Sequence, residues 1–302
     1  CGEDKKVNAV KNIGVIQLVE HAALDLANKG IVDAVNARGL KVKFDQQNAQ
    51  ADQSNLHNIA QRFVTQKSDL IFAIATPAAQ SVANATKSIP IVATAVTDFE
   101  IAKLVKSNAK PDTNVTGSSD MNPVEAQVDL ILALCPKAKR IGTIYNSSEI
   151  NSQFQIDIAK KHIQKRGLKY VEVTVSSVND IQQAAVSLVG KVDAIYVPTD
   201  NVVASAIPLL TAITTPKRIP VVVAETGMLQ GGGLATLGVD YYELGKIAGN
   251  MGADILEGKA KPQDMPIRVQ TEFKAVINTT AAKALGLNIP KALADKSELK
   301  AF

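Results

Sequence analysis

The feature that most constrains this chain is a regular alternation of short apolar segments with longer amphipathic ones. Short segments rich in Val and Ile, such as Ile13–Val19 and Leu70–Ala75, alternate with segments of helical spacing, such as Ala22–Arg38 and Asp52–Gln66. Strands that alternate with helices predict an α/β fold with parallel sheets. Several of these strands are apolar throughout, which indicates that helices cover both faces of each sheet.

The alternation runs twice along the chain, which predicts two doubly wound, Rossmann-like lobes. One copy occupies residues 13–96 and the other occupies residues 141–237. The segment Asn114–Gly117 lies between the copies, is flanked by Pro111 and Pro123, and is predicted to be a hinge crossing. In such a protein the carboxyl ends of both sheets are expected to face a shared cleft, where a ligand binds.

Composition excludes several other classes of protein. Hydrophobic residues make up 46% of the 302 residues and charged residues 21%, which is ordinary for a folded, globular chain. The 33 basic and 29 acidic residues nearly balance, and aromatic residues are only 4% with no Trp. A nucleic-acid partner is therefore not expected, since such proteins carry clustered basic surface and aromatic stacking platforms.

Polar residues collect directly after the predicted strands, where the ligand site of a doubly wound fold is expected. Hydroxyl and amide groups dominate these positions in the first half of the chain, and carboxylates dominate them in the second. The candidate ligand-binding residues are Gln17, Glu20, His21, Thr76, Pro77, Thr94, Val96, Thr97 and Asp98 in the first half, and Asn146, Ser147, Glu149, Asp200, Asn201, Glu225 and Asp240 in the second.

This asymmetry between the halves predicts a site for a small zwitterion such as an amino acid. A helix N-terminus beside a Thr offers free N–H groups and a partial positive charge, which suit a carboxylate. Carboxylates from the other half suit an ammonium group. The alternative for each single residue is a structural role, because Asp, Asn, Ser and Thr also cap helices and form turns at these places in any α/β fold.

Motifs for catalysis or for metal binding are missing from the sequence. The three histidines and two cysteines show neither HExxH nor CxxC spacing, and neither a GxxxxGK[ST] loop nor a GxSxG elbow occurs. We therefore expect no metal, no cofactor and no catalytic residue. An enzyme that uses the carboxylates of the cleft for acid–base chemistry is the less favoured alternative.

The first residues resemble the start of a processed bacterial lipoprotein. Cys1 is followed by the polar, charged run Gly2-Glu3-Asp4-Lys5-Lys6, which has no apolar period. We expect Cys1 to carry a lipid, with residues 1–10 as a tether to the membrane. The other reading is a chain that simply happens to begin there.

Several short motifs, taken in order, resemble one protein family over about residues 11 to 290. They are Gln17-Leu18-Val19-Glu20-His21, Asn48-Ala49-Gln50, Ala75-Thr76-Pro77-Ala78-Ala79-Gln80, Ala95-Val96-Thr97-Asp98, Asn114-Val115-Thr116-Gly117, Tyr145-Asn146-Ser147-Ser148-Glu149-Ile150-Asn151-Ser152 and Thr199-Asp200-Asn201. The chain resembles the bacterial ABC-transporter substrate-binding lipoproteins related to tryptophan and tyrosine binders. These have the type I periplasmic-binding-protein fold.

The resemblance implies two lobes joined by three crossings, made of residues 11–117 plus 240–267 and of residues 118–239 plus 268–302. It implies an extracytoplasmic receptor without catalytic activity that binds a small zwitterion by hinge closure, with Trp, Phe or Tyr favoured. Its implied partners are the permease and ATPase subunits of an ABC importer and the membrane, through the lipid on Cys1. The receptor itself is expected to be a monomer. A signalling receptor on the same fold, with no transport role, is the alternative.

The resemblance also assigns roles to the candidate residues. Thr76, Thr94, Val96 and Thr97 would meet the ligand carboxylate. Asn146, Glu149, Asp200 and Asn201 would close from the other lobe, with Glu225 and Asp240 as further candidates. One departure concerns Phe99, where relatives usually have Pro; it would either add an aromatic wall to the pocket or pack beneath the hinge.

Overall fold

The computed structural model describes residues 9–302 and divides the chain into two compact units. Unit 1 runs to Met121 and includes Asp240–Thr271, and unit 2 comprises Asn122–Val239 and Glu272–Phe302. The chain therefore passes from one unit to the other three times. Cys1 lies outside the described residues, so the expected lipid on it stays a prediction.

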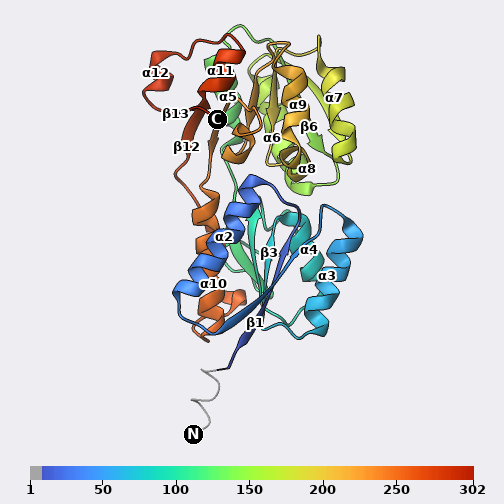
Figure 1. The fold of residues 1–302 in the computed structure, drawn as a ribbon, viewed down its shortest axis with the longest axis vertical. Coiled ribbons are helices and arrows are strands. Elements are labelled where there is room, and N and C mark those ends of the chain that lie inside the picture. The colour runs from blue at the N-terminus through green and yellow to red at the C-terminus, as the bar shows by residue number, and fades with distance from the viewer. Residues whose placement is uncertain (1–8) are drawn as a thin grey trace. The chain divides into compact units, whose positions relative to one another are not determined.

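Unit 1 contains a six-stranded, all-parallel sheet in the order β11-β5-β4-β3-β1-β2. Figure 1 shows α2 and α10 together on one face of this sheet and α3 and α4 on the other. The strands are β1 (Lys11–Gln17), β2 (Val42–Asn48), β3 (Leu70–Ile74), β4 (Ile91–Val96), β5 (Val115–Ser119) and β11 (Arg268–Val269). The helices are α2 (Ala22–Ala37), α3 (Gln53–Thr65), α4 (Thr76–Ala85), α10 (Tyr241–Leu256) and the short 3₁₀ turn η3 (Pro262–Asp264).

Two helices of unit 1 pack with their backbones in direct contact. A Cβ atom on Gly245 of α10 would lie 2.0 Å from the carbonyl oxygen of Ala27 in α2, and one on Gly30 of α2 would lie 2.3 Å from the carbonyl oxygen of Tyr242. Only glycine permits so close an approach. These two glycines therefore fix how the returning segment of the chain docks onto unit 1.

The hinge predicted at Asn114–Gly117 is wrong, because this segment is part of an inner strand. Strand β5 is buried along its whole length and lies between β4 and β11. Its polar groups are satisfied internally: the Thr116 hydroxyl donates to the Met265 carbonyl at 2.7 Å, and the Ser118 hydroxyl donates to the Leu244 carbonyl at 3.0 Å. Unit 1 consequently extends to Met121, past the expected end at residue 117.

Unit 2 contains a seven-stranded sheet in the order β13-β12-β10-β9-β8-β6-β7, in which only the β10–β12 pair is antiparallel within the described chain. The strands are β6 (Arg140–Asn146), β7 (Lys169–Val175), β8 (Ala194–Val197), β9 (Val221–Val223), β10 (Ala235–Gly238), β12 (Lys274–Asn278) and β13 (Glu298–Lys300). The helices are α5 (Val124–Leu134), α6 (Ile150–Lys165), α7 (Ile181–Leu188), α8 (Asn201–Ser205), α9 (Ile207–Thr214), α11 (Thr279–Ala284) and α12 (Lys291–Ala294), with 3₁₀ turns η1 (Val178–Asp180) and η2 (Thr226–Leu229).

Two apolar clusters hold unit 2 together, one on each face of its sheet. Helices α5, α6 and α11 supply one cluster, and α7, α8 and α9 supply the other. This arrangement confirms the predicted α/β class with two Rossmann-like units. Among residues 9–302, no helix is long and apolar enough to cross a membrane.

Candidate functional site

The topology of each sheet marks one place for a ligand. In a doubly wound sheet, ligands bind outside the carboxyl ends of the two adjacent strands whose connections lead in opposite directions. In unit 1 these strands are β1 and β3, and in unit 2 they are β6 and β8. At the first pair of strands, Gln17 ends β1 and the predicted residues Glu20, His21, Thr76 and Pro77 follow the strands. At the second pair, Asn146 ends β6 and Ser147, Glu149, Asp200 and Asn201 follow the strands.

At the end of β3, Thr76 begins helix α4 with a buried hydroxyl group. Its side chain is only 2% exposed, and the Oγ1 atom has no hydrogen-bond partner within residues 9–302. Leaving a buried hydroxyl unpaired costs roughly 1–3 kcal/mol. An arrangement of this kind is expected where a ligand completes the hydrogen bonding.

The backbone just before Thr76 is strained. Ala75 has φ 88° and ψ 156°, a combination that is nearly exclusive to glycine. Its own N–H is held by the carbonyl of Thr94 at 3.0 Å. The strain turns the chain sharply out of β3, so that the N-terminus of α4 lies at the carboxyl edge of the sheet. The first-turn N–H groups of a helix attract anions there.

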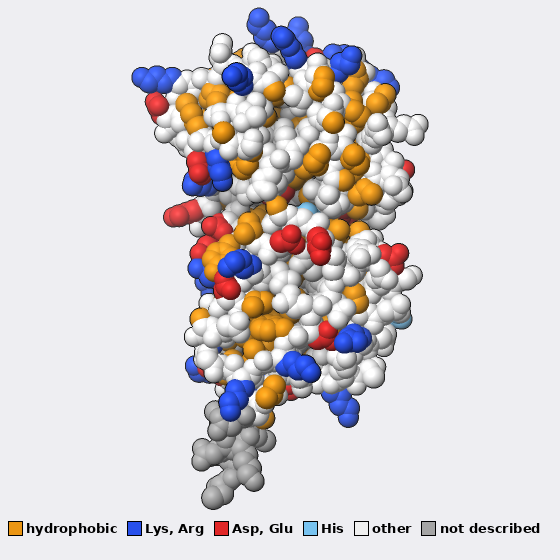
Figure 2. All heavy atoms as spheres, in the orientation of Figure 1, with side chains coloured by type: hydrophobic (Ala, Val, Ile, Leu, Met, Phe, Trp, Pro, Cys, Tyr) orange, Lys and Arg blue, Asp and Glu red, His pale blue; other side chains and the backbone are white. Residues whose placement is uncertain are grey.

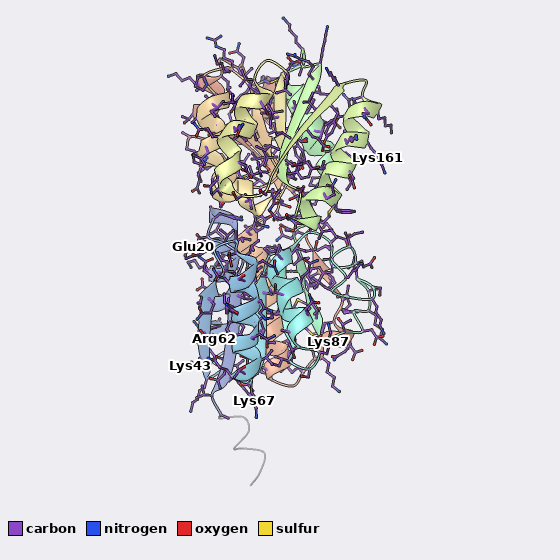
Figure 3. The ribbon with its side chains drawn as sticks, turned by 90° about the vertical axis from the view of Figure 1, so that its right-hand side faces the viewer. Glu20, Lys43, Arg62, Lys67, Lys87 and Lys161 are labelled. Atoms are coloured by element: carbon purple, nitrogen blue, oxygen red, sulfur yellow. The ribbon has the colours of Figure 1, made fainter. Side chains whose placement is uncertain are left out.

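The residues after β1 lie beside a polar groove of about 480 Å³ formed by the end of β1, α2 and β2. Gln17 is buried and tied down, since its amide donates to Asp25 at 2.8 Å and accepts from Asn28 at 2.9 Å. Glu20 is exposed at this edge, where Figure 3 labels it. His21 occupies the N-cap position of α2 without a capping bond from its side chain. Among these three, Glu20 is the one that extends into solvent.

The polar residues at the end of β4 have structural partners within unit 1. The Thr94 and Ser118 hydroxyls are hydrogen-bonded at 2.8 Å, and the Thr97 hydroxyl donates to Asp120 at 3.3 Å. The Asp98 carboxylate caps a turn by accepting the Ile101 N–H at 2.8 Å. The binding role that the resemblance assigned to Thr94, Val96 and Thr97 therefore remains a prediction. For Thr94 the structure shows a strand-to-strand contact instead.

In unit 2 a buried pair of carboxyl groups lies at the predicted place. Glu149 is 3% exposed, and its oxygens accept from the Asn201 side-chain amide at 2.6 Å and from the backbone N–H groups of Asn201 and Val202 at 3.1–3.3 Å. Asp200 is fully buried and interacts directly with Glu149. The Glu149 carboxyl thereby occupies the N-terminus of α8.

Asp200 connects β6, β8 and α8. It accepts the Asn146 N–H and the Ser152 hydroxyl, each at 2.6 Å, and caps α8 by accepting the Val203 N–H at 2.9 Å. The structural alternative, that Asp200 is a helix cap, is therefore confirmed. Because Asp200 also faces the buried carboxyl group of Glu149, it can still take part in binding a cation.

The electrostatics of this pair favour a cation. Burial and the neighbouring negative charge of Asp200 raise the pKa of Glu149 to about 8, and burial also raises the pKa of Asp200. Within residues 9–302, no ion pair involves either residue. The pair therefore holds either one shared proton or unbalanced negative charge. An ammonium group would compensate it.

Three residues that the sequence analysis did not select position this pair, and all lie on the first turns of α6. Asn151 donates to the Thr199 carbonyl at 3.0 Å, Ser152 binds Asp200, and Gln155 donates to the Thr199 hydroxyl at 2.6 Å. Their signal in the sequence is a run of polar residues on the buried face of an amphipathic helix. Together they hold the loop between β8 and α8 in place.

The other predicted residues of the second half act as caps or are exposed. Glu225 is 2% exposed and accepts the N–H groups of Gly227 and Met228 at 2.8 and 2.9 Å. Asp240 is exposed, belongs to unit 1 and caps α10. Ser147 is exposed, and the part of the chain that the structure describes contains no cluster of His, Cys, Asp or Glu residues suited to a metal.

The two units differ at equivalent positions. In unit 2 the helix N-terminus after the inner strand already holds a carboxyl group, that of Glu149. In unit 1 the equivalent N-terminus, that of α4, presents the unpartnered Thr76 hydroxyl, while Glu20 after β1 points to solvent. Unit 2 thus shows with its own side chain that such an N-terminus binds a carboxyl group. Unit 1 offers the same chemistry to a carboxylate from outside.

Comparison with known proteins agrees with this geometry. The family model described as ABC transporter substrate binding protein matches residues 12–299. The chain is 44% identical to a tyrosine-binding protein of Clostridioides difficile over 94% of this chain and 84% of that protein. It is 40% identical to a solved ABC domain in complex with L-Trp from Streptococcus pneumonia, with a TM-score of 0.93 over 96% of this chain and 99% of that one.

A more distant structure shares the fold alone. A solute-binding protein from Bacillus halodurans with bound myo-inositol is 16% identical, with a TM-score of 0.67 over 92% of this chain and 98% of that one. The match of the family model to nearly the whole chain determines the assignment. This chain belongs to the ABC transporter substrate-binding protein family and has the type I periplasmic-binding-protein fold that its sequence predicted.

Proposed function

We propose that this chain, a substrate-binding protein of an ABC transporter, receives an aromatic L-amino acid without changing it chemically. Unit 1 binds the ligand carboxylate at the N-terminus of α4, through Thr76 and the first-turn N–H groups. Unit 2 binds the ammonium group through the buried pair Glu149 and Asp200. The observation that carries this proposal is the buried Thr76 hydroxyl without a partner in the described chain.

The preference for an aromatic side chain rests on relatives. One similar protein is named for tyrosine binding, and another was solved with L-Trp. The chain is 44% and 40% identical to these two proteins over nearly its full length. An aliphatic pocket can bury an aromatic ring by area alone, so the small number of aromatic residues in this chain does not oppose the proposal.

The setting proposed for this activity follows from the family. Substrate-binding proteins of ABC importers work outside the cytoplasm and deliver their ligand to a permease and its ATPase subunits. We propose that the chain acts as a monomer, that closure of the two units on the ligand signals occupancy, and that a lipid on Cys1 keeps the receptor at the membrane. Closure of this kind is a shift in population toward the state with more ligand contacts.

Calorimetry with matched ligands tests the proposal. L-Tyr, L-Trp and L-Phe should bind with a stoichiometry of one. Tyramine, which lacks the carboxylate, and 3-(4-hydroxyphenyl)propionate, which lacks the ammonium group, should each bind far more weakly. Equal binding of either analogue would refute the zwitterion site. Tight binding of aliphatic amino acids alone would refute the aromatic preference and leave the zwitterion site standing.

A further inference from the structure

Unit 1 has a basic edge that the ligand site does not use. Because all six strands of its sheet are parallel, the loops that precede them lie together at one edge. Figure 3 labels Lys43, Arg62, Lys67 and Lys87 toward the lower end of unit 1, and Figure 2 shows blue side chains in that region. The lysines just before or at the start of strands β1 to β4 are Lys11, Lys41, Lys43, Lys67 and Lys87.

The charges at this edge are not balanced within the described chain. Lys11, Lys41, Lys43, Lys67 and Lys87 form no ion pair within residues 9–302, and all except Lys11 are exposed. The ion pairs near the same edge, such as Arg38 with Asp254 and Lys106 with Asp112, balance their own charges and leave these five lysines as a positive excess. This excess of positive charge predicts a partner with negative charge.

The acidic residues near this edge are already engaged. Asp45 accepts the Arg62 Nε–H at 2.7 Å, and Asp69 accepts the backbone N–H of Asn12 at 2.7 Å. Two further carboxylates near this edge are also paired, Asp254 with Arg38 and Asp112 with Lys106. The unpaired charges at this edge are therefore mainly those of the five lysines.

Two ordinary explanations cover only part of this pattern. Basic residues after helices complement the negative helix C-terminus, which accounts for Lys67 after α3 and Lys87 after α4. Lysines on an edge strand prevent pairing with another chain, which accounts for Lys43 on β2. Neither explains why Lys11 on the inner strand β1 and Lys41 join the same edge.

A hollow in this edge suits a phosphate group. It measures about 340 Å³, lies between edge strand β2 and helix α3, and is lined by Lys43, Phe44, Asp45, Arg62, Gln66 and Ser68. Lys43 and Arg62 both line this hollow, where the Asp45 carboxylate accepts the Arg62 Nε–H and Lys43 has no ion pair within residues 9–302. Arg and Lys side chains are the usual ligands of phosphate groups in proteins.

The position of the edge along the chain indicates which anionic surface it meets. Strand β1 starts at Lys11, so the eight residues before Ala9 join unit 1 at this edge. Eight residues reach at most about 29 Å when fully extended. Val10, which is 55% exposed, adds an apolar side chain at the same place. A basic surface next to the segment that leads to the lipid attachment proposed at residue 1 fits a membrane.

We propose that the basic edge of unit 1, made of Lys11, Lys41, Lys43, Lys67 and Lys87, docks onto an anionic lipid bilayer, with lipid phosphates meeting Lys43 and Arg62. The inference does not depend on the identity of the amino-acid ligand, but the choice of a bilayer as the partner rests on the lipid proposed above for Cys1. It concerns an electrostatic contact, which holds unit 1 on the bilayer with its ligand-binding edge directed away.

Sedimentation with vesicles tests the docking surface, using the full chain without lipid modification. The protein should bind phosphatidylcholine vesicles that contain phosphatidylglycerol, should not bind pure phosphatidylcholine vesicles, and should dissociate at high salt. The double variant Lys43→Gln/Lys67→Gln should bind roughly 25-fold more weakly, since each basic residue contributes about fivefold in affinity near such a surface.

The matched control removes two positive charges from unit 2. Lys161 and Lys165 are exposed on α6 and form no ion pair in the described chain. Lys161→Gln/Lys165→Gln should bind vesicles like the unchanged protein, and circular dichroism should show the same melting temperature for all three proteins. An equal loss in both double variants would overturn the proposal, as would binding to neutral vesicles or binding to soluble polyphosphate but not to lipid.

Discussion

Replacing Thr76 by Val separates ligand binding from folding, because the two should change in opposite directions. Valine has nearly the shape of threonine and loses only the hydroxyl. In the ligand-free protein that hydroxyl is buried, 2% exposed and without a partner in residues 9–302. Its removal should therefore leave the free energy of unfolding unchanged or raise it by about 1 kcal/mol.

Affinity should move the other way. A hydrogen bond from a hydroxyl to a carboxylate contributes about 1.5–3 kcal/mol, so Thr76→Val should weaken amino-acid binding roughly 10- to 150-fold. Most polar-to-apolar changes in a core lower stability and affinity together. A variant that is more stable but binds its ligand more weakly is therefore the result expected only if the Thr76 hydroxyl bonds the ligand.

Thr214→Val is the matched control for this experiment. Thr214 is also fully buried with an unpartnered hydroxyl in the described chain, but it ends helix α9, away from the carboxyl edge of the sheet. Urea titrations followed by circular dichroism give the stability, and calorimetry with L-Tyr and L-Trp gives the affinity. Unchanged affinity in Thr76→Val, or an equal loss in Thr214→Val, would refute the role of Thr76.

Three further changes test other parts of the structure. Burial raises the pKa of Glu149 to about 8 from 4.5, so the folded state keeps a proton that the unfolded chain releases. The free energy of unfolding should therefore fall by up to about 1.4 kcal/mol per pH unit for this group between about pH 5 and 8. In urea titrations Glu149→Gln should reduce this decline to the part that Asp200 contributes, and the exposed Glu272→Gln should leave it unchanged. Asp200→Asn keeps the size of the side chain but removes the charge that would pair with the ligand ammonium. Calorimetry should show a loss of roughly 2–5 kcal/mol of binding free energy, and an unchanged affinity would exclude Asp200 from the site. Gly245→Ala places a Cβ atom 2.0 Å from the Ala27 carbonyl oxygen and should lower the free energy of unfolding by on the order of 1–3 kcal/mol, whereas wild-type stability would contradict the tight helix contact.

The sequence predicted the parts of the fold that follow from hydrophobic periodicity. Strand β3 follows from the apolar run Leu70–Ala75, and helices α2 and α3 follow from the helical spacing of Ala22–Arg38 and Asp52–Gln66. The strand-end rule then placed Thr76, Glu149 and Asp200 at the carboxyl edges of the sheets without any distance information.

The parts that were missed depend on contacts between segments far apart in the chain. Val115–Ser119 contains Thr, Gly and two Ser residues, which locally favour a crossing segment over a buried strand. The segment is nevertheless buried, because Leu244 and Met265 supply hydrogen-bond acceptors from more than a hundred residues away. Phe99, the departure from the family pattern, is fully buried, which a local pattern cannot decide. The buried face of α6 was missed because Gln155 finds its partners far along the chain, at Thr199 and Asn122.

A crystal structure of the protein with L-tyrosine or L-tryptophan tests the central claim most directly. We expect the ligand carboxylate within about 3 Å of Thr76 Oγ1 at the start of α4, and the ligand ammonium in contact with the Glu149 and Asp200 pair. A ligand bound with its carboxylate elsewhere, or with its ammonium far from both carboxyl groups, would contradict the account.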